Sequence, residues 1–349
     1  MLGVIIPVYK SRDTLPQALD SLVAQTNRKF ITILSIDCDG EDYSDIVEEY
    51  TRRGLTIWVV NAKENGGPGM ARQNGMDATQ QLDFYMFLDA DDMFYPRAVE
   101  ILYHEIQVGD YDVIASDIMH EVRNGISNIM PVDSTPCTWC HGKVYRASYL
   151  RKNDIRFLPE FRLNEDAYFN LVAFNCGKSG MVKEPMYLWR DNPNSLTRKI
   201  SNREFYRQTY AQYILTQIKG LKKMYAIKGE LPFGSACGTI VNIYKMMMRE
   251  VYEDGQDKSY MEDLLSLRTF QPVQDLIDNG EFWTTVIGML PAAERTENSI
   301  FFYTQRFVDW VNEYLRTEES KVVSLESTQT SAPVTTPVQE GQLNADSGR

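Results

Sequence analysis

The sequence predicts an α/β fold, with a mostly parallel sheet flanked by helices, over roughly its first 120 residues. Two observations favour this fold: short apolar runs alternate with stretches of helical periodicity, and acidic turns directly follow two of the runs. The runs lie at residues 3–8, 30–36, 55–60 and 84–88. Because ligands bind beyond the carboxyl ends of strands in open α/β sheets, we expect both acidic turns to face one crevice.

The first helix and strand illustrate the pattern. Residues 3–8 are apolar, as in a buried strand, and Asp13 and Thr14 can cap a helix that Pro16 enters early. The apolar residues of this helix recur at helical spacing and are Leu15, Ala18, Leu19, Leu22 and Val23. A second strand over 30–36 and a second helix around residues 46–50 repeat the order.

The second half of the chain is less regular. Strand segments are expected at 112–116 and 181–184, and helices at 205–225, 240–252 and 300–315, none of which contains proline. From residue 318 the chain is rich in Ser, Thr, Pro, Gln and Gly and has little to bury, which predicts a disordered tail over 318–349. We therefore expect a domain over residues 1–200, a helical domain over 201–317, and the tail.

Charge and composition exclude several classes of protein. The 349 residues include 36 basic and 48 acidic ones, a net charge of −12, which disfavours a nucleic-acid partner for the chain as a whole. No run approaches the roughly 18–20 apolar residues of a membrane helix, and the N-terminus has no basic leader, so we expect a cytoplasmic protein. Five cysteines cannot all pair, which favours reduced thiols.

An acidic cluster, Asp89-Ala90-Asp91-Asp92, stands where the strand over 84–88 meets solvent. Carboxylate oxygens suit Mg²⁺ or Mn²⁺, which bind one or two protein carboxylates and take further ligands from substrate phosphates. The alternative is a solvated acidic turn or a helix cap.

Three other segments are expected at the same crevice. Pro7-Val8-Tyr9-Lys10 ends the first strand and offers an aromatic ring for stacking on a base, and Asp39 before Gly40 can accept a hydrogen bond from a base N–H. A glycine-rich turn over 65–75 precedes a helix and brings backbone N–H groups and Arg72 near an anion. Each segment alone is equally consistent with turn chemistry, a core aromatic or a surface arginine.

In this order and at these separations, the four segments resemble family 2 glycosyltransferases with the GT-A fold, a Rossmann-like, mostly parallel mixed sheet flanked by helices. The resemblance covers about residues 1–200. It implies a nucleotide-sugar-binding half over 1–115, an acceptor half over 116–200 and an appended helical domain after them. The residue roles it implies are nucleotide contacts at Pro7, Val8, Tyr9, Asp39 and Arg72, a ribose contact at Asp89, and coordination of Mn²⁺ or Mg²⁺ by Asp91.

One departure from the family pattern concerns the base contact. The family usually has adjacent aspartates before the glycine, whereas here Cys38 separates Asp37 from Asp39. Either carboxylate could meet the base, and we prefer Asp39 because it directly precedes Gly40.

The second half supplies a general base and further contacts. Glu165-Asp166 resembles the family's Glu-Asp motif, which makes Asp166 the expected base of an inverting enzyme; the alternative is a pair of charges favoured by a helix N-terminus. Arg190, in a segment resembling the family's Tyr-x-x-Arg motif, is expected to reach the donor diphosphate. The residues expected on the acceptor side are Trp139, His141, Glu165 and Trp189.

Two other sequence patterns would indicate functions other than glycosyl transfer. Cys137-Thr138-Trp139-Cys140-His141 matches a haem-attachment pattern, but haem attachment normally follows export, and a closed zinc site would need a fourth ligand. The basic, tyrosine-rich stretch over 206–228 is typical of a solvated helix face and is also where a nucleic-acid or membrane contact would lie.

We therefore expect a metal-dependent inverting glycosyltransferase that moves a sugar from a nucleotide-sugar, with UDP as the expected nucleotide, to an acceptor hydroxyl. A sugar-1-phosphate nucleotidyltransferase is the alternative enzyme, although the segment after the first strand lacks the glycine-rich loop it should have. A non-catalytic scaffold that binds sugar nucleotides is the other alternative. Polysaccharide, lipid-linked sugar, protein and modified nucleobase remain open as acceptors, as do the sugar and the oligomeric state.

Overall fold

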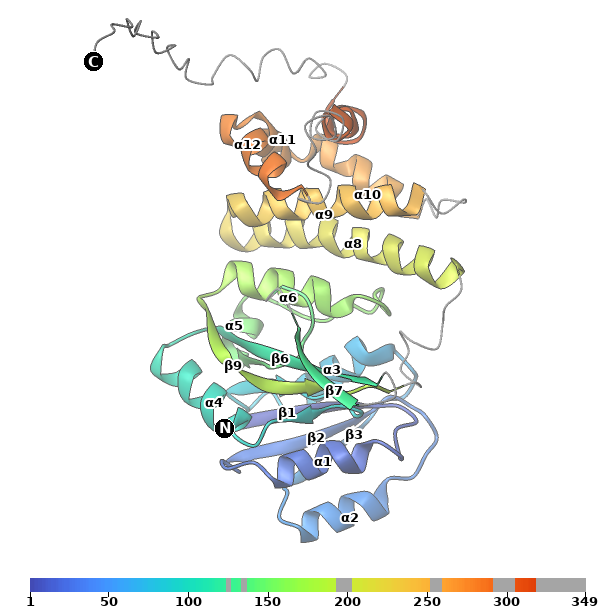
Figure 1. Cartoon of the computed structure of the whole chain (residues 1–349), viewed down its shortest axis with the longest axis vertical. Coiled ribbons are helices and arrows are strands. Elements are labelled where there is room, and N and C mark those ends of the chain that lie inside the picture. Colours follow the sequence, from blue (N-terminus) through green and yellow to red (C-terminus); the bar gives the residue numbers. More distant parts are fainter. Residues whose placement is uncertain (124–126, 133–136, 193–202, 252–258, 291–304, 318–349) are drawn as a thin grey trace, which may run out of the picture. The chain divides into compact units, whose positions relative to one another are not determined.

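A computed structural model describes residues 1–123, 127–132, 137–192, 203–251, 259–290 and 305–317 (Figure 1). Within these residues one mixed sheet has the strand order β3-β2-β1-β4-β8-β6-β9-β5, and β7 pairs with β6 at its side. The strands are β1 (Leu2–Val8), β2 (Phe30–Ile36), β3 (Ile57–Asn61), β4 (Phe84–Phe87), β5 (Met93–Phe94), β6 (Val113–Arg123), β7 (Ser127–Val132), β8 (Lys143–Arg146) and β9 (Ser179–Trp189).

Strands β1 to β4 run parallel, as the alternation of apolar runs and helices predicts. Strand β8 is antiparallel to both β4 and β6, so β6 points the same way as β4. Strands β1, β2 and β4 therefore all end at one edge of the sheet, where the acidic turns begin.

Side chains of β1 point alternately to the two faces of the sheet, and each face is covered by a layer of helices. Val4, Ile6 and Val8 pack with α1 (Leu15–Val23), α2 (Ser44–Arg52) and α4 (Ala98–Val108) on one face. On the other face lie α3 (Gly67–Ala78), α5 (Ala147–Lys152) and α6 (Glu165–Cys176) (Figure 1). Gly75 lets α3 approach this face closely, because an added Cβ there would lie 2.7 Å from Cγ2 of Ile5.

An aromatic group fills the layer between the sheet and α6. The rings of Phe157 and Phe169 stack with centroids 4.2 Å apart, and Phe87 and Tyr145 of the sheet meet Phe169 edge-on or nearly so. All four side chains are buried. This packing sets the distance between α6 and strand β4, the two elements that carry the acidic residues of the site.

Helices continue beyond the sheet. Helix α8 (Arg203–Lys228) packs on α6, where Gly220 allows close approach to Leu171, and α9 (Phe233–Val251) packs on α8. They are followed by α10 (Met261–Leu265), η1 (Ser266–Thr269), α11 (Gln271–Asp278) and α12 (Gly280–Met289). No helix among the described residues has the length and apolarity needed to cross a bilayer.

The chain separates into two compact units, Met1–Pro291 and Ala292–Arg349. In the second unit, residues 305–310 are helical and end in a π-helical turn, η3 (Val311–Leu315), so the helix expected over 300–315 is described only in its second part. The tail expected over 318–349 lies outside the described residues. The domain boundaries expected at 200 and 317 stay predictions.

The strands of the second half are longer than expected. The segments 112–116 and 181–184 extend into the eleven-residue strands β6 and β9, and β5, β7 and β8 were not predicted at all. Polar residues such as His120 and Glu121 interrupt the apolar pattern of β6, and Pro185 lies at a register shift opposite Asp117. These strands extend further because they form hydrogen bonds with neighbouring strands. The local periodicity of the sequence does not reveal this pairing.

The aromatic layer predicts a stability effect. We expect Phe169→Ala to lower the free energy of unfolding by about 3–5 kcal/mol, because a fully buried ring that contacts three others leaves a cavity. Val108→Ala is the control, since that side chain is 70% exposed, and a change within about 0.5 kcal/mol is expected there. Urea unfolding followed by circular dichroism measures both, and equal effects would contradict the packing described.

Candidate active site

Asp37, directly after β2, anchors the start of α3. Its two carboxylate oxygens accept the backbone N–H groups of Gly66 and Gly67 at 2.9 and 2.8 Å. Gly67 has φ of +83°, a conformation that favours glycine. Because both oxygens of the buried Asp37 bind the start of α3, this carboxylate orients the helix that carries Arg72.

Asp39 lies at the surface end of the same turn. Its Oδ2 accepts the backbone N–H of Lys10 and the hydroxyl of Tyr43, both at 2.7 Å, and its Oδ1 accepts the N–H of Glu41 at 3.0 Å. Burial opposes its charge, but these donors lower the pKa of Asp39. Cys38 between the aspartates takes a left-handed φ of 53°, which turns the two carboxylates to different partners.

The segment after β1 lies beside Asp39. Tyr9 is 48% exposed, and the ammonium of Lys10 lies over its ring, 5.4 Å from the centroid. Val8 is buried, and its carbonyl accepts the N–H of Asp37 at 2.9 Å, while Pro7 is partly buried. Of the expected contacts at residues 7–9, only Tyr9 presents an exposed side chain.

Arg72 joins the two acidic motifs. Its Nη2 donates to Oδ1 of Asp89 at 2.6 Å, and its Nη1 donates to Oε1 of Glu165 at 2.8 Å, although the sequence separates Arg72 and Glu165 by 93 residues. Gly69 makes this possible, since an added Cβ would lie 2.5 Å from Cγ of Glu165. Burial raises the pKa of Glu165 to about 7 together with the charge of Asp166, while Arg72 opposes the rise.

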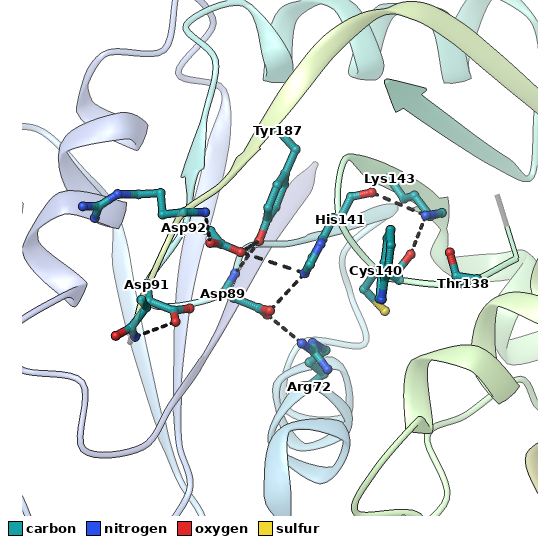
Figure 2. A network of polar contacts seen from close by, with 12 residues as sticks. Arg72, Asp89, Asp91, Asp92, Thr138, Cys140, His141, Lys143 and Tyr187 are labelled. Carbon is teal, nitrogen blue, oxygen red and sulfur yellow. Dashed lines mark hydrogen bonds and ion pairs between the residues drawn. The ribbon is translucent and has the colours of Figure 1, made fainter. Parts of the chain in front are cut away.

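His141 lies between two aspartates after β4. Its Nε2 is 3.2 Å from Oδ2 of Asp89 and 3.9 Å from Oδ2 of Asp92, and its ring stacks on Tyr187 with centroids 4.5 Å apart (Figure 2). Burial disfavours the imidazolium, but Asp89 and Asp92 outweigh burial and raise the pKa of His141. Burial likewise opposes the charge of Asp89, yet Arg72 and His141 hold its pKa well below the usual range.

Asp92 and Asp91 face different partners. The buried Asp92 accepts the Tyr187 hydroxyl at 2.7 Å and the backbone N–H of Arg190 at 2.8 Å, and its burial raises the pKa to about 7. Asp91 is half-buried and accepts Nδ2 of Asn192 at 2.8 Å (Figure 2). Burial and the nearby charge of Asp89 raise the pKa of Asp91.

Asp166 is the second residue of α6, next to Glu165. Asn164 precedes the helix in a left-handed conformation, with φ of 58°, and turns the chain into the site. No side chain among the described residues donates to the carboxylate of Asp166, which is half-buried and within electrostatic range of Arg72, His141 and Asp89. Burial raises its pKa.

The remaining predicted residues lie around His141. The ring of Trp139 is nearly parallel to that of His141 at 6.1 Å and is 5.5 Å from that of Trp189, which stacks on His120 at 4.4 Å. The guanidinium of Arg190 contacts Gln17 Oε1 and lies 3.8 Å from Glu121. Arg190 is therefore joined to α1 and β6, and to Asp92 only through its backbone.

The structure thus brings Arg72, Asp89, His141, Glu165 and Asp166 together and places Tyr9 and Asp39 nearby at the same edge of the sheet. Sequence reasoning assigned no role to Asp92, Tyr187 or Lys143, and only the position of Asp92 in an acidic run was a signal for it. A separate cavity of about 580 Å³, lined in part by Asp112, Tyr149 and Lys228, lies at the opposite edge, where β6 begins, and contains none of these residues.

The fold and site together define a protein of the GT-A class, with a carboxylate-rich site at the carboxyl edge of a mixed sheet. The family model described as Glycosyl transferase family 2 matches residues 3–183, more than half of the chain. The chain therefore belongs to glycosyl transferase family 2, as its motifs predicted.

Several curated proteins are similar to the chain. The uncharacterized glycosyltransferase EpsJ of Bacillus subtilis is 25% identical over 218 residues, which cover 56% of this chain and 63% of EpsJ. The poly(ribitol-phosphate) beta-glucosyltransferase of Bacillus spizizenii is 27% identical over 186 residues, 50% of this chain and 29% of that protein. TarS of Staphylococcus aureus, a poly(ribitol-phosphate) beta-N-acetylglucosaminyltransferase, is 26% identical over 221 residues, 58% and 38% respectively. The matched part is less than two thirds of each relative's length.

Crystal structures of S. aureus TarS residues 1–349 share the fold. The complex with UDP has a TM-score of 0.57 at 17% identity and covers 88% of this chain and 87% of that one. The complex with UDP-GlcNAc has a TM-score of 0.56 at 19% identity and covers 82% and 81%. At these identities the likeness confirms the fold alone.

Arg72 provides a test of the site's geometry. We expect Arg72→Gln to lower the free energy of unfolding by about 3–5 kcal/mol, because it leaves the buried Glu165 carboxylate without its cation and leaves Asp89 with His141 alone. Arg156→Gln is the matched control, since Arg156 pairs with Asp77 at 3.0 Å in an exposed position, and a change within about 1 kcal/mol is expected. Equal losses in urea unfolding would show that Arg72 does not neutralise the two carboxylates.

Proposed function

We propose that this chain catalyses the inverting transfer of a sugar from a nucleotide-sugar, with UDP as the nucleotide, to an acceptor hydroxyl, assisted by Mn²⁺ or Mg²⁺. The observation that carries the proposal is the Arg72 bridge, which joins Asp89 after β4 to Glu165 on α6. Asp166, the next residue of α6, is within electrostatic range of Arg72 and would supply the acceptor-side carboxylate that such a transfer needs. The family membership supports the reaction class.

The donor nucleotide would lie across the ends of β1 and β2. Tyr9 offers an exposed ring for stacking on the base, and Asp39 is proposed as the carboxylate for a base N–H, because Asp39 is partly exposed whereas Asp37 is buried. Asp89 would meet the ribose, and Arg72 would stay beside the diphosphate. The TarS complexes with UDP and UDP-GlcNAc, which share the fold, support a uridine nucleotide.

The metal site is proposed at Asp91. Asp92 is occupied by Tyr187 and the Arg190 backbone, and Asp89 by Arg72 and His141, whereas Asp91 accepts from only one described side chain, Asn192. Burial and the charge of Asp89 raise the pKa of Asp91, and a divalent cation bound there would stabilise the charged carboxylate. Ligand atoms of Asp89, Asp92 and His141 lie within 4.8 Å of one another and form a second possible set. A bound cation would supply charge neutralisation for the leaving diphosphate.

Asp166 would act as the general base. Its carboxylate takes the proton of the acceptor hydroxyl while that oxygen forms the bond to the anomeric carbon and the bond to the nucleoside diphosphate breaks on the opposite face. Glu165 is less suited, because Arg72 binds it. The raised pKa of Asp166 makes it a stronger base than an exposed aspartate.

The acceptor would lie beside Trp139 and Trp189, whose half-buried rings adjoin His141 at the site. Aromatic faces suit the apolar faces of sugar rings. Two of the similar proteins are named for poly(ribitol-phosphate), so that polymer belongs in an acceptor screen with polysaccharides, lipid-linked sugars and proteins. Contacts of the diphosphate with Arg190 and a cytoplasmic location stay predictions.

The base assignment predicts that Asp166→Asn keeps UDP affinity but lowers turnover at least about 10²-fold, since the amide cannot accept the proton. Turnover is measured as UDP release from a panel of UDP-sugars, and affinity by calorimetry with UDP. Asp154→Asn, an exposed aspartate of the same charge, is the control. Wild-type turnover in Asp166→Asn would reassign the base, and no UDP release by the wild type with any donor would favour the scaffold alternative.

The metal assignment predicts that Mn²⁺ increases the thermal stabilisation by UDP and that excess chelator removes the increase. Asp91→Asn should lose the Mn²⁺-dependent part, because it removes a charged ligand. Asp110→Asn, at the exposed turn after α4, should keep it. UDP-induced shifts that are identical with Mn²⁺ and with chelator would contradict a metal at the donor site.

A further inference from the structure

Residues 138–142 form an irregular segment that brings Trp139 and His141 to the site. Four of its five carbonyls are held by side chains: those of residues 138, 139, 141 and 142. Asn170 of α6 donates to the Thr138 carbonyl at 2.6 Å, and Ser116 Oγ of β6 donates to the Gly142 carbonyl at 2.9 Å. Gly142 has φ of +60°, so the chain turns sharply just before β8. Side chains from three elements therefore determine the path of this segment.

Lys143 holds the middle of the segment. It is 2% exposed, and its Nζ donates to the carbonyl of Trp139 and, at 3.4 Å, to that of His141 (Figure 2). Among the described residues no carboxylate lies within ion-pair distance of it, although the charge of Asp166 acts on it, and the ring of Phe174 lies 5.8 Å from Nζ. Burial lowers the pKa of Lys143 to about 8. An ammonium is thus kept in the interior to bind two main-chain carbonyls.

Burying this charge is costly for the fold. An apolar residue in its place would avoid the desolvation of the ammonium but would leave the carbonyls of Trp139 and His141 without this donor. The ammonium also fixes the orientation of the main chain, because it binds the carbonyls of the two residues whose rings lie at the site. The ring of His141 stacks on Tyr187 and reaches Asp89, and that of Trp139 adjoins Trp189.

We propose that Lys143 is a positioning residue, whose ammonium binds the carbonyls of Trp139 and His141 and so holds these two side chains in place for transfer. Its effect on turnover rests on the proposed function, whereas its effect on the position of His141 does not. Ser116 acts on the same segment from the other side, through the Gly142 carbonyl.

Lys143→Met tests the proposal, since methionine keeps the length of the stem and cannot donate. Lys178→Met is the matched control, because Lys178 Nζ also donates to a main-chain carbonyl, that of Gly109 at 2.8 Å, but in an exposed position. The chain has three histidines, so the ring signals of His141 can be assigned by NMR in the full chain. In Lys143→Met we expect the His141 signals to lose the ring-current shift from Tyr187, with His104 unchanged. Unchanged His141 signals would overturn the proposal.

UDP release and UDP affinity form the second measurement. We expect Lys143→Met to lower turnover about 10- to 100-fold, since displaced groups near the reacting atoms cost rates of this order, while UDP affinity is kept by Tyr9 and Asp39. A loss of thermal stability with wild-type turnover of the folded protein would reduce Lys143 to a structural role. If the wild type releases no UDP, the proposed function fails and the NMR result still decides on Lys143.

Ser116→Ala is the second variant, and it keeps the test informative if Lys143→Met does not fold. It removes the hydroxyl that donates to the Gly142 carbonyl but keeps the backbone N–H of Ser116, which donates to the same carbonyl at 2.9 Å, and circular dichroism checks that it folds. We therefore expect the His141 signals to move in the same direction and by less than in Lys143→Met. Wild-type signals for His141 in a folded Ser116→Ala would show that this hydroxyl does not help to position the segment.

Discussion

The Arg72 guanidinium is the contact on which the site depends. It lies buried between Asp89 and Glu165, at 2.6 and 2.8 Å, and neutralises carboxylates that come from opposite halves of the domain. Without a cation there, the buried Glu165 carboxylate would lack compensation, and Asp89 would retain only His141. Two features at the start of α3 position Arg72. Asp37 accepts the first N–H groups of this helix, and Gly69 lets the helix approach α6 closely.

The charges around Arg72 explain why a metal belongs to the proposed reaction. Five carboxylates gather here, those of Asp89, Asp91, Asp92, Glu165 and Asp166, against the charges of Arg72 and His141. Burial raises the pKa of several of them, which is the expected response where anions are crowded and partly desolvated. A donor diphosphate would add negative charge to this group, and a divalent cation would offset it. Part of the acidity of the whole chain is therefore concentrated at one edge of the sheet.

The second half of the domain positions the opposite side of the site. Strands β6, β8 and β9 carry the residues around His141. The aromatic rings that contact Phe169 determine how α6 packs on this part of the sheet. His141 connects the two sides, because its ring packs on Tyr187 of β9 and its Nε2 faces Asp89. Lys143 and Ser116 hold the segment that presents it. This side of the site is thus built from long-range contacts rather than from one motif.

Local pattern in the sequence was enough to predict the parallel strands β1, β2 and β4 and the acidic turns at their ends, because the apolar period and the turn residues lie within a few positions of each other. The same motifs correctly identified the family. The preference for Asp39 over Asp37 as the contact of the base stays a prediction, since both carboxylates accept hydrogen bonds within the protein. The assignment of Arg190 to the diphosphate depends on side-chain direction, and here its guanidinium contacts Gln17 and Glu121.

Only the tertiary structure decided which charges meet. Nothing in the spacing of Arg72 and Glu165 predicts an ion pair, because their contact requires α3 and α6 to pack on the same face of the sheet with a glycine between them. The position of His141 between Asp89 and Asp92 could not be read from the sequence, and its expected place on the acceptor side stays a prediction. Lys143 drew no functional interpretation, since a buried lysine is recognised by its surroundings and not by its neighbours in sequence. Residue types and their local order are properties of the sequence, whereas burial, pairing and the pKa shifts that follow from them arise from contacts between distant segments.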